Sequence, residues 1–262
     1  MAATVQEIKQ MLLQANDESF TVLERSLSAD TRKGVRIAVE STRRRLEAQR
    51  AEIARLDGLY SFQESIAKEH GGRVVLGLDE VGRGSIAGPL AVGGVVLPDE
   101  PHIQGLNDSK QLSPAKREEI ADQVRQTAIA WTVQYVEPDV IDSIGMTASL
   151  RRAFSSAIAQ IEKAGIEVDV VLLDGNPMHL DKRQVNVIKG DARCASIAAA
   201  SIVAKVERDA LMTRYAVEYP QYDLEDCKGY GSAKHIAAIK QHGLSPIHRA
   251  SFCTSFMQES LF

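Results

Sequence analysis

Four acidic residues follow apolar runs in this chain, and their residue types suggest a shared chemistry. Asp79 and Glu80 come directly after the apolar run in RVVLGLDEVGRGSIAGPL. Asp174 ends the run in VVLLDGN, and Asp191 follows a weaker run in VIKGDARC. Ligand sites in open α/β sheets gather where strands finish. We therefore predict that these four acids, here named the acid quartet, share one edge of a sheet.

Four carboxylates at one edge repel one another unless protons or cations relieve the repulsion. Two unit charges about 4 Å apart repel by roughly 4 kcal/mol at an effective dielectric constant of about 20. Oxygen ligands without histidine or cysteine favour Mg²⁺ or Mn²⁺ over zinc. Two such ions, about 3.5–4 Å apart, support in-line attack of water on a phosphodiester. The acid quartet therefore predicts a metal-dependent phosphodiesterase.

Each acid alone also has a structural explanation. Asp191 suits an N-cap that opens the alanine-rich helix after it, and Asp174 before Gly175 suits a turn. This explanation is weaker for the four together, because each of them follows an apolar strand.

The glycine turn GRGSIAG, residues 82–88, fits the G-x-G-x-x-A variant of the dinucleotide-binding fingerprint. That fingerprint requires a helix directly after the turn. Here Pro89 follows the turn and residues 90–97 predict a strand, so dinucleotide binding is disfavoured. The glycines instead allow backbone amides to approach a ligand closely, with Arg83 as a side-chain donor.

The apolar pattern predicts the elements that would position these residues. Strands are expected at 73–79, 90–97, 128–136, 168–173 and 184–189, and helices at 114–126, 146–164, 192–215 and 232–242. Strand hairpins come first and strand–helix units follow. This order predicts an α/β domain with a mixed sheet.

The first 70 residues differ from the rest of the chain. They contain no convincing strand, and residues 29–70 predict helix. Between residues 32 and 55, eight Arg and Lys residues stand against three Glu. This segment is either a solvated helical face, which we favour, or a basic surface that contacts phosphates.

The composition is that of an ordinary globular protein, with 44% apolar and 25% charged residues. The net charge of −4 gives no sign of a nucleic-acid partner, so any such partner must contact a local patch. No apolar run approaches the length of a membrane span, and the N-terminus lacks an apolar signal core. Three widely spaced cysteines form no CxxC pair. We therefore expect a cytoplasmic protein without a membrane partner, and we take a monomer as the starting assumption.

From residue 71 to 252 the chain resembles bacterial ribonuclease HII. The matching segments, in order, are GLDEVGRGSIAGPL, LNDSKQLSPAKRE, LLDGN, VIKGDARCASIAAASIVAKVERDALM, YPQYDLEDCKGYGSAKH and GLSPIHRASF. The resemblance implies a ribonuclease H-like α/β fold: a mixed five-stranded sheet flanked by helices, with an N-terminal helical extension and a C-terminal helical region. The expected domains are the extension at 1–70, the catalytic domain at 71–252 and a tail at 253–262.

The resemblance also implies an activity. Such enzymes use Mg²⁺ or Mn²⁺ to cleave the RNA strand of RNA–DNA hybrids. They also nick duplex DNA on the 5′ side of single embedded ribonucleotides, leaving 3′-OH and 5′-phosphate ends, which links them to DNA replication and ribonucleotide excision repair. Two alternatives are a structure-specific DNA nuclease of the same fold and a non-catalytic hybrid-binding module whose acids hold a structural ion.

By resemblance, the catalytic metal ligands are the acid quartet, the same residues that the strand-end pattern selects: Asp79, Glu80, Asp174 and Asp191. One departure is Ser85-Ile86, where many relatives have Pro-Leu, and we expect it to change only the stiffness of the turn.

The resemblance assigns further residues to the substrate. Gly82, Arg83 and Gly84 match a GRG motif that contacts the ribose 2′-OH, the group that distinguishes RNA from DNA. Tyr230, in KGYG, matches a tyrosine that stacks on the next deoxyribose. Lys110, in NDSK, matches a lysine that contacts phosphate. Without the resemblance, a core tyrosine and an ordinary exposed lysine would be the simpler interpretations.

A basic segment and a short tail complete the predicted contacts. Residues 228–249 contain no acid and four basic residues, Lys228, Lys234, Lys240 and Arg249. We predict that this segment lines the groove for the duplex, with Lys228 and Lys234 as substrate contacts and residues 32–55 as a possible second contact.

The last five residues, QESLF, resemble peptides that dock on the bacterial sliding clamp. Gln258, Leu261 and Phe262 would be the anchors, and tethering would raise the local concentration of a nuclease on DNA. The alternative is an apolar tail that packs on its own domain.

Overall fold

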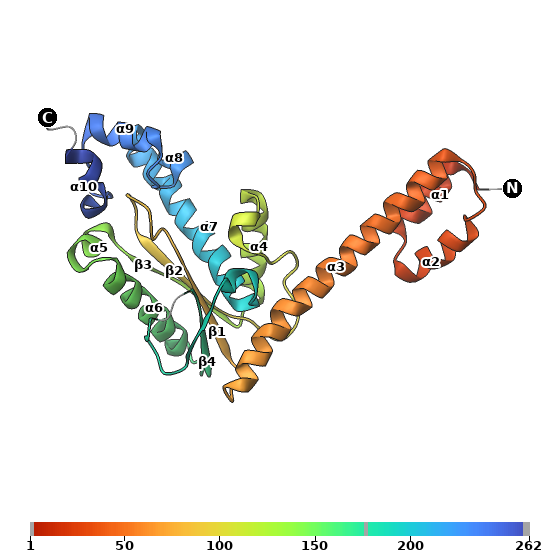
Figure 1. Ribbon diagram of the computed structural model, residues 1–262, viewed down its shortest axis with the longest axis horizontal. Helices are drawn as coiled ribbons and strands as arrows, with labels where there is room; N and C mark the ends of the chain where they lie inside the picture. The colour runs from red at the N-terminus through yellow and green to blue at the C-terminus, as the bar shows by residue number, and fades with distance from the viewer. Residues whose placement is uncertain (1–2, 176–177, 259–262) are drawn as a thin grey trace. The chain divides into compact units, whose positions relative to one another are not determined.

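The computed structural model describes residues 3–175 and 178–258 (Figure 1). The chain divides into two compact units: an N-terminal unit that ends at Asp57 and a C-terminal unit that begins at Gly58. Each unit has its own hydrophobic core. In the described part of the chain, no helix combines the length and the apolar character that a membrane span needs.

The N-terminal unit is helical, as the sequence predicts. It contains α1 (Val5–Gln14), α2 (Asp17–Ser26) and the first part of α3 (Lys33–Glu69). Thr4 and Asn16 each form a capping box at the start of their helix, which satisfies backbone N–H groups there. Buried apolar residues from all three helices form the core, including Ile8, Leu12, Phe20, Val35 and Leu46.

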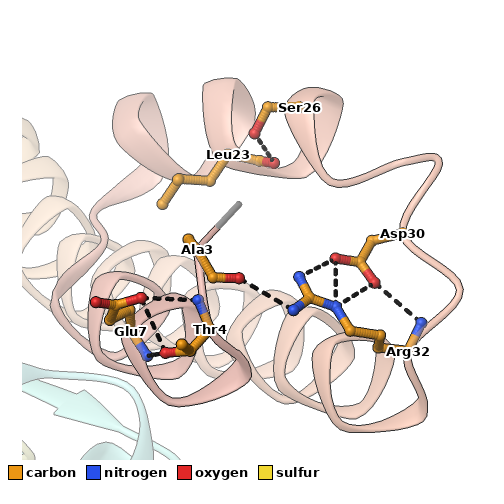
Figure 2. Close-up of polar contacts among 7 residues, drawn as sticks. All are labelled: Ala3, Thr4, Glu7, Leu23, Ser26, Asp30 and Arg32. Carbon is orange, nitrogen blue, oxygen red and sulfur yellow. Dashed lines mark hydrogen bonds and ion pairs between the residues drawn. The ribbon is translucent and has the colours of Figure 1, made fainter. Parts of the chain in front are cut away.

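Polar contacts hold the connections between these helices. Figure 2 shows the side chain of Arg32 donating to the backbone carbonyl of Ala3 at 3.0 Å and pairing with the carboxylate of Asp30. The same view shows the Thr4–Glu7 capping contacts at the start of α1.

The basic excess at residues 32–55 is largely matched by acids of the same unit. Arg43 pairs with Glu24 of α2 and with Glu40, and Arg50 lies 3.4 Å from Asp17. Residues 1–57 contain ten Arg and Lys residues and nine Asp and Glu residues. These pairs favour the interpretation of this segment as a solvated helical face over a phosphate-binding surface.

The C-terminal unit contains the predicted mixed five-stranded sheet, in the order β3-β2-β1-β4-β5. The strands are β1 (Val75–Val81), β2 (Leu90–Val96), β3 (Ala130–Val136), β4 (Val170–Asp174) and β5 (Gln184–Val187). β2 pairs antiparallel with β1 and β3, whereas β4 pairs parallel with β1 and β5. The glycine turn leads into β2 and not into a helix, which agrees with the rejection of a dinucleotide site.

Helices cover both faces of this sheet (Figure 1). On one face, α5 (Pro138–Ile144) and α6 (Met146–Lys163) share a core with apolar residues of β1, β2 and β4. On the other face lies α7 (Ala195–Glu218), with α4 (Pro114–Thr127) packed against it. Residues of the last turns of α3 also pack on this second face. The C-terminal helical region comprises α8 (Leu224–Cys227), α9 (Ala233–His242) and α10 (Ala250–Gln258).

Several predicted boundaries differ from the structure by a few residues, and two of the differences concern the acid quartet. β1 continues through Asp79 and Glu80 to Val81, because these residues keep pairing with β2. Asp191 does not cap the alanine-rich helix: it lies in the short 3₁₀ turn η2 (Gly190–Ala192), and α7 begins only at Ala195.

The alanine-rich start of α7 lies unusually close to the sheet. A Cβ atom added to Gly77 of β1 would lie 2.3 Å from the backbone carbon of Ser196, and one added to Gly93 of β2 would lie 2.3 Å from the carbonyl oxygen of Ala200. Neither contact is physically possible, so glycine at these positions sets the distance between helix and sheet.

We predict that Gly77→Ala lowers the free energy of unfolding by about 1–3 kcal/mol, the usual cost of overpacking a rigid core. The matched control is Gly58→Ala, since Gly58 lies in α3 with no atom within 4 Å of the added Cβ. There the better helix propensity of alanine should raise stability by up to about 1 kcal/mol. Urea unfolding measures both variants, and equal effects would contradict the close-packing explanation.

Candidate active site

The parallel pairing of β1 with β4 places two members of the acid quartet side by side. The register pairs Leu78 with Leu173, so the next residues along the two strands are Asp79 and Asp174. Asp79 is 6% exposed, and Asp174 is partly buried. The register therefore sets two carboxylates next to each other at the strand ends.

The turn after β5 brings Asp191 to the same edge. β4 and β5 are parallel neighbours, and the backbone N–H of Gly190 donates to Asp174 Oδ1 at 2.6 Å. Asp191 follows Gly190 and is 7% exposed. Lys110 Nζ lies 3.2 Å from Asp191 Oδ2, so its ammonium group approaches the quartet from the loop before α4.

Two buried serines, one on α7 and one in the loop before α4, form a hydrogen-bonded pair that supports Asp79. Ser201 of α7 forms a side-chain hydrogen bond with Asp79 that stabilises its charged form. The hydroxyl of Ser201 lies 3.0 Å from that of Ser109, in the short 3₁₀ turn η1 (Ser109–Gln111). The NDSK segment thus contributes to the site through Ser109 as well as Lys110.

Glu80 completes the quartet and faces a cation of the glycine turn. Arg83 Nη1 lies 3.5 Å from Glu80 Oε1, while the Arg83 side chain is 64% exposed. The pair is therefore loose, and Arg83 is free to turn toward a ligand.

Burial and mutual repulsion disfavour the charged forms of the carboxyl groups at this edge of the sheet. Burial raises the pKa of Asp79 well above its usual range, against the hydrogen bond from Ser201, and the neighbouring Glu80 and Asp174 raise it further. Burial likewise raises the pKa of Glu80, with Arg83 opposing and Asp174 adding to the effect. The pKa of Asp174 is raised by burial and by Asp191, although the Gly190 N–H and Lys110 oppose this.

The donor set fits hard divalent cations. Its four members offer only carboxylate oxygens, which suit Mg²⁺ or Mn²⁺, and a cation would relieve their repulsion. Within residues 3–175 and 178–258, no three His, Cys, Asp or Glu side chains already form a coordination site.

Two buried arginines anchor the glycine turn beside the quartet. Arg208 of α7 donates to the carbonyls of Pro89, Ala87 and Lys228, and Arg249 donates to those of Gly88 and Arg83. Both side chains are fully buried. Gly82 has φ of +82°, and an added Cβ would lie 2.2 Å from Arg208 Nε, so only glycine fits there.

The glycine turn and the KGYG segment, residues 228–231, form one hydrogen-bonded body. The N–H groups of Ile86 and Ala87 both donate to the carbonyl of Gly229, at 2.9 and 3.1 Å. The adjacent Tyr230 is 39% exposed as a residue, and the guanidinium carbon of Arg208 lies 5.7 Å from the centroid of its ring. The structure thus brings the GRG motif and Tyr230 together, and Tyr230 is not the core tyrosine of the simpler interpretation.

The basic segment at 228–249 needs one correction. Arg249 does not contribute surface charge, because it is fully buried against backbone carbonyls. Lys234 is exposed and lies 3.8 Å from Asp223, Lys240 is exposed, and Lys228 donates to Thr213 Oγ1 at 2.7 Å. The duplex contact of the three lysines stays a prediction.

The tail prediction cannot be placed on this structure. Leu261 and Phe262 lie outside the described residues, and Gln258 ends α10.

The sequence interpretation gave no role to Ser201 or Arg208. A signal for Arg208 exists in the helical spacing: Ala200, Ala204 and Arg208 recur every four residues on the buried face of α7. A charged residue on such a stripe indicates a buried structural or functional contact.

Comparison with known proteins identifies the family of this chain. A family model described as Ribonuclease HII matches residues 76–255, and one described as Ribonuclease HII N-terminal domain matches residues 4–67. Ribonuclease HII of Listeria monocytogenes is 37% identical over 252 residues, which cover 96% of this chain and 95% of that protein.

Solved structures show the same fold. Ribonuclease H2 from Pyrococcus horikoshii OT3 matches with a TM-score of 0.60 and 25% identity, covering 72% of this chain and 99% of that one. The ribonuclease HII of Archaeoglobus fulgidus, solved in a complex with PCNA, matches with a TM-score of 0.59 and 26% identity, covering 68% of this chain and 94% of that one.

Fold and comparisons together define the class of protein as a metal-dependent hydrolase with a ribonuclease H fold. Within that class, the chain belongs to the ribonuclease HII family of endoribonucleases. The sequence prediction of this family, and of its mixed five-stranded fold, is confirmed.

We predict that Asp79→Asn stabilises the metal-free protein. The pKa of Asp79 is raised on folding, so its charge lowers stability at neutral pH, and that penalty fades as the pH falls below the folded pKa. Removing the charge should raise the midpoint of thermal unfolding in EDTA at pH 7 by a few degrees, and the gain should shrink at pH 4. Added Mg²⁺ should stabilise the wild type more than the variant. A lower midpoint for the variant at pH 7 would contradict this account.

Proposed function

We propose that this protein cleaves the RNA strand of RNA–DNA hybrids and nicks duplex DNA on the 5′ side of single embedded ribonucleotides. The strongest support is that the acid quartet and the glycine turn lie next to each other, both in the chain and in the fold. The acid quartet suits phosphodiester hydrolysis, and the glycine turn, which begins two residues after Glu80, suits recognition of a ribose. A substrate that contacts both would be cut next to its 2′-OH.

Asp79, Glu80, Asp174 and Asp191 are the residues that would hold two Mg²⁺ or Mn²⁺ ions. When bound, such ions lower the pKa of the attacking water and offset the charge that develops on the leaving oxygen. The contribution of the chain is to hold the four carboxylates at one partly buried edge of the sheet. Ser201 and the N–H of Gly190 orient Asp79 and Asp174 there.

Lys110 is the residue that we assign to a substrate phosphate. Its side chain is 79% exposed and flexible, so its ammonium can leave Asp191 and pair with a phosphate oxygen. This exchange would free the Asp191 carboxylate at the moment when substrate arrives.

The glycine turn and Tyr230 are the residues that we assign to the sugar. A Cβ at Gly84 would have no atom within 4 Å, so its bare backbone is open to close approach by a ribose. The partly exposed Tyr230 ring offers a flat face to the next sugar along the strand. Both are anchored by Arg208, so the two contacts keep a constant spacing.

In the proposed reaction, water attacks the phosphorus on the 5′ side of the ribonucleotide. The bond from phosphorus to the 3′ oxygen of the preceding nucleotide breaks. The products carry a 3′-OH and a 5′-phosphate.

The decisive experiment uses a DNA duplex with one embedded ribonucleotide, a continuous RNA–DNA hybrid and an all-DNA duplex. We predict Mg²⁺- or Mn²⁺-dependent cleavage of the first two and none of the third. Asp174→Asn should slow cleavage at least about a hundredfold, since an isosteric amide cannot supply the charge. Glu162→Gln, a change in a surface ion pair at the end of α6, is the matched control and should cut at the wild-type rate.

Two results would point elsewhere. Cleavage of the all-DNA duplex would indicate a structure-specific DNA nuclease of the same fold. Tight binding of the hybrid without cleavage in either metal would indicate a binding module.

We also propose that the C-terminal QESLF segment docks on a sliding clamp. The solved complex of the Archaeoglobus relative with PCNA supports a clamp as the type of partner. A variant lacking Leu261 and Phe262 should lose retention on immobilised bacterial clamp while cutting the short duplex at the wild-type rate. Equal retention of both forms would rule out this role for the tail.

A further inference from the structure

Two buried histidines lie directly behind the KGYG segment. His235 of α9 is 0% exposed, and His248, in the connection from α9 to α10, is 5% exposed. Their Nε2 atoms are 3.0 Å apart. Neither ring belongs to the acid quartet or to the proposed sugar contacts, so the proposed chemistry leaves this histidine pair unexplained.

The neighbouring groups determine which nitrogen carries the proton in each ring. The backbone N–H of Ser245 can only donate, and it lies 3.0 Å from His248 Nδ1, so this nitrogen accepts. A neutral His248 ring therefore carries its proton on Nε2 and donates it to His235 Nε2. His235 must then carry its proton on Nδ1, which lies 2.9 Å from the carbonyl oxygen of Tyr230.

The result is a one-way chain of hydrogen bonds from the Ser245 N–H, through both rings, to the Tyr230 carbonyl. Each donor has an acceptor, as buried polar groups require. Burial lowers the pKa of His248 to about 4 and also lowers the pKa of His235, so both rings are neutral at neutral pH. The Tyr222 and His248 rings pack in a T-shaped contact, with 4.6 Å between their centroids.

This chain of hydrogen bonds ends on the backbone of Tyr230, which is partly exposed to solvent. On one side, the Tyr230 N–H donates to the carbonyl of Cys227, and the Gly229 carbonyl is held by the glycine turn. On the other side, the Tyr230 carbonyl accepts from the backbone N–H of Ser232 at 2.8 Å and from His235 Nδ1 at 2.9 Å. The backbone of Tyr230 is thus fixed from both directions, while the residue remains 39% exposed.

We propose that His235 and His248 are positioning residues. They fix the backbone of Tyr230, and so hold its ring in the orientation needed to contact the sugar next to the ribonucleotide. They act through the Tyr230 carbonyl and touch no substrate. This inference rests on the proposed function of Tyr230.

The test compares His235→Leu with His235→Asn, two side chains of similar size. The asparagine amide can replace the Nδ1 donor to Tyr230, and leucine cannot. We expect His235→Leu to slow nicking at a single ribonucleotide about tenfold, in line with the loss of one buried hydrogen bond, while cleavage of a continuous hybrid falls much less. His235→Asn should recover most of the nicking rate. His242→Leu, a change of an exposed histidine on the same helix, should match the wild type.

A double-mutant cycle separates positioning from general stability. Tyr230→Ala should show the same selective loss, and His235→Leu should add almost nothing to it, because both changes remove one function. Additive losses, or equal losses on both substrates with a lower thermal midpoint, would overturn the proposal. If His235→Leu does not fold, His248→Gln against His248→Leu gives the same contrast, since glutamine keeps a donor near the Nε2 position.

Failure of the proposed function itself would be visible without any histidine variant. Wild type that does not nick at a ribonucleotide, or Tyr230→Ala that nicks at the wild-type rate, would remove the role of Tyr230 and this inference with it.

Discussion

The parallel register between β1 and β4 is the constraint on which the site depends. It places Asp79 and Asp174 at neighbouring strand ends, one of them buried, where their charges repel. The close approach of α7, permitted by Gly77 and Gly93, brings the Ser201 hydroxyl onto Asp79. The fold therefore maintains an arrangement that costs stability when no cation is bound. Such a cost is typical of functional sites, where stability is sacrificed for chemistry.

Two buried arginines connect the region of the acid quartet to the surface that we assign to the sugar. Arg208 and Arg249 satisfy backbone carbonyls of the glycine turn and of Lys228, and carbonyls are uncommon as the main partners of buried guanidinium groups. The turn, the KGYG segment and the histidine pair are consequently held as one body against α7. Because these parts are rigid, the glycine turn would already be in position to contact a 2′-OH and would not need to rearrange when substrate binds.

Much of the fold follows from local sequence patterns. The strands at β1, β2 and β4 are continuous apolar runs, and the acids that follow them are recognisable because charge at the end of a buried strand is unusual. What the sequence could not give were contacts between distant segments. Pairing of Glu80 and Val81 with β2 extends β1 past the acids, and the carbonyls that surround Arg249 come from residues more than 160 positions away. Arg249 therefore resembled surface charge in the sequence, and the sequence interpretation set no helix bounds before residue 29, where the structure has α1 and α2.

The most direct test of this account measures Mn²⁺ binding by electron paramagnetic resonance, with the protein at neutral pH and no nucleic acid. Wild type should bind Mn²⁺, and Asp174→Asn should weaken binding about tenfold or more, because the quartet loses one charge at its centre. The surface variant Glu162→Gln should bind as wild type does. Equal binding by wild type and Asp174→Asn would contradict the claim that these acids form a cation site.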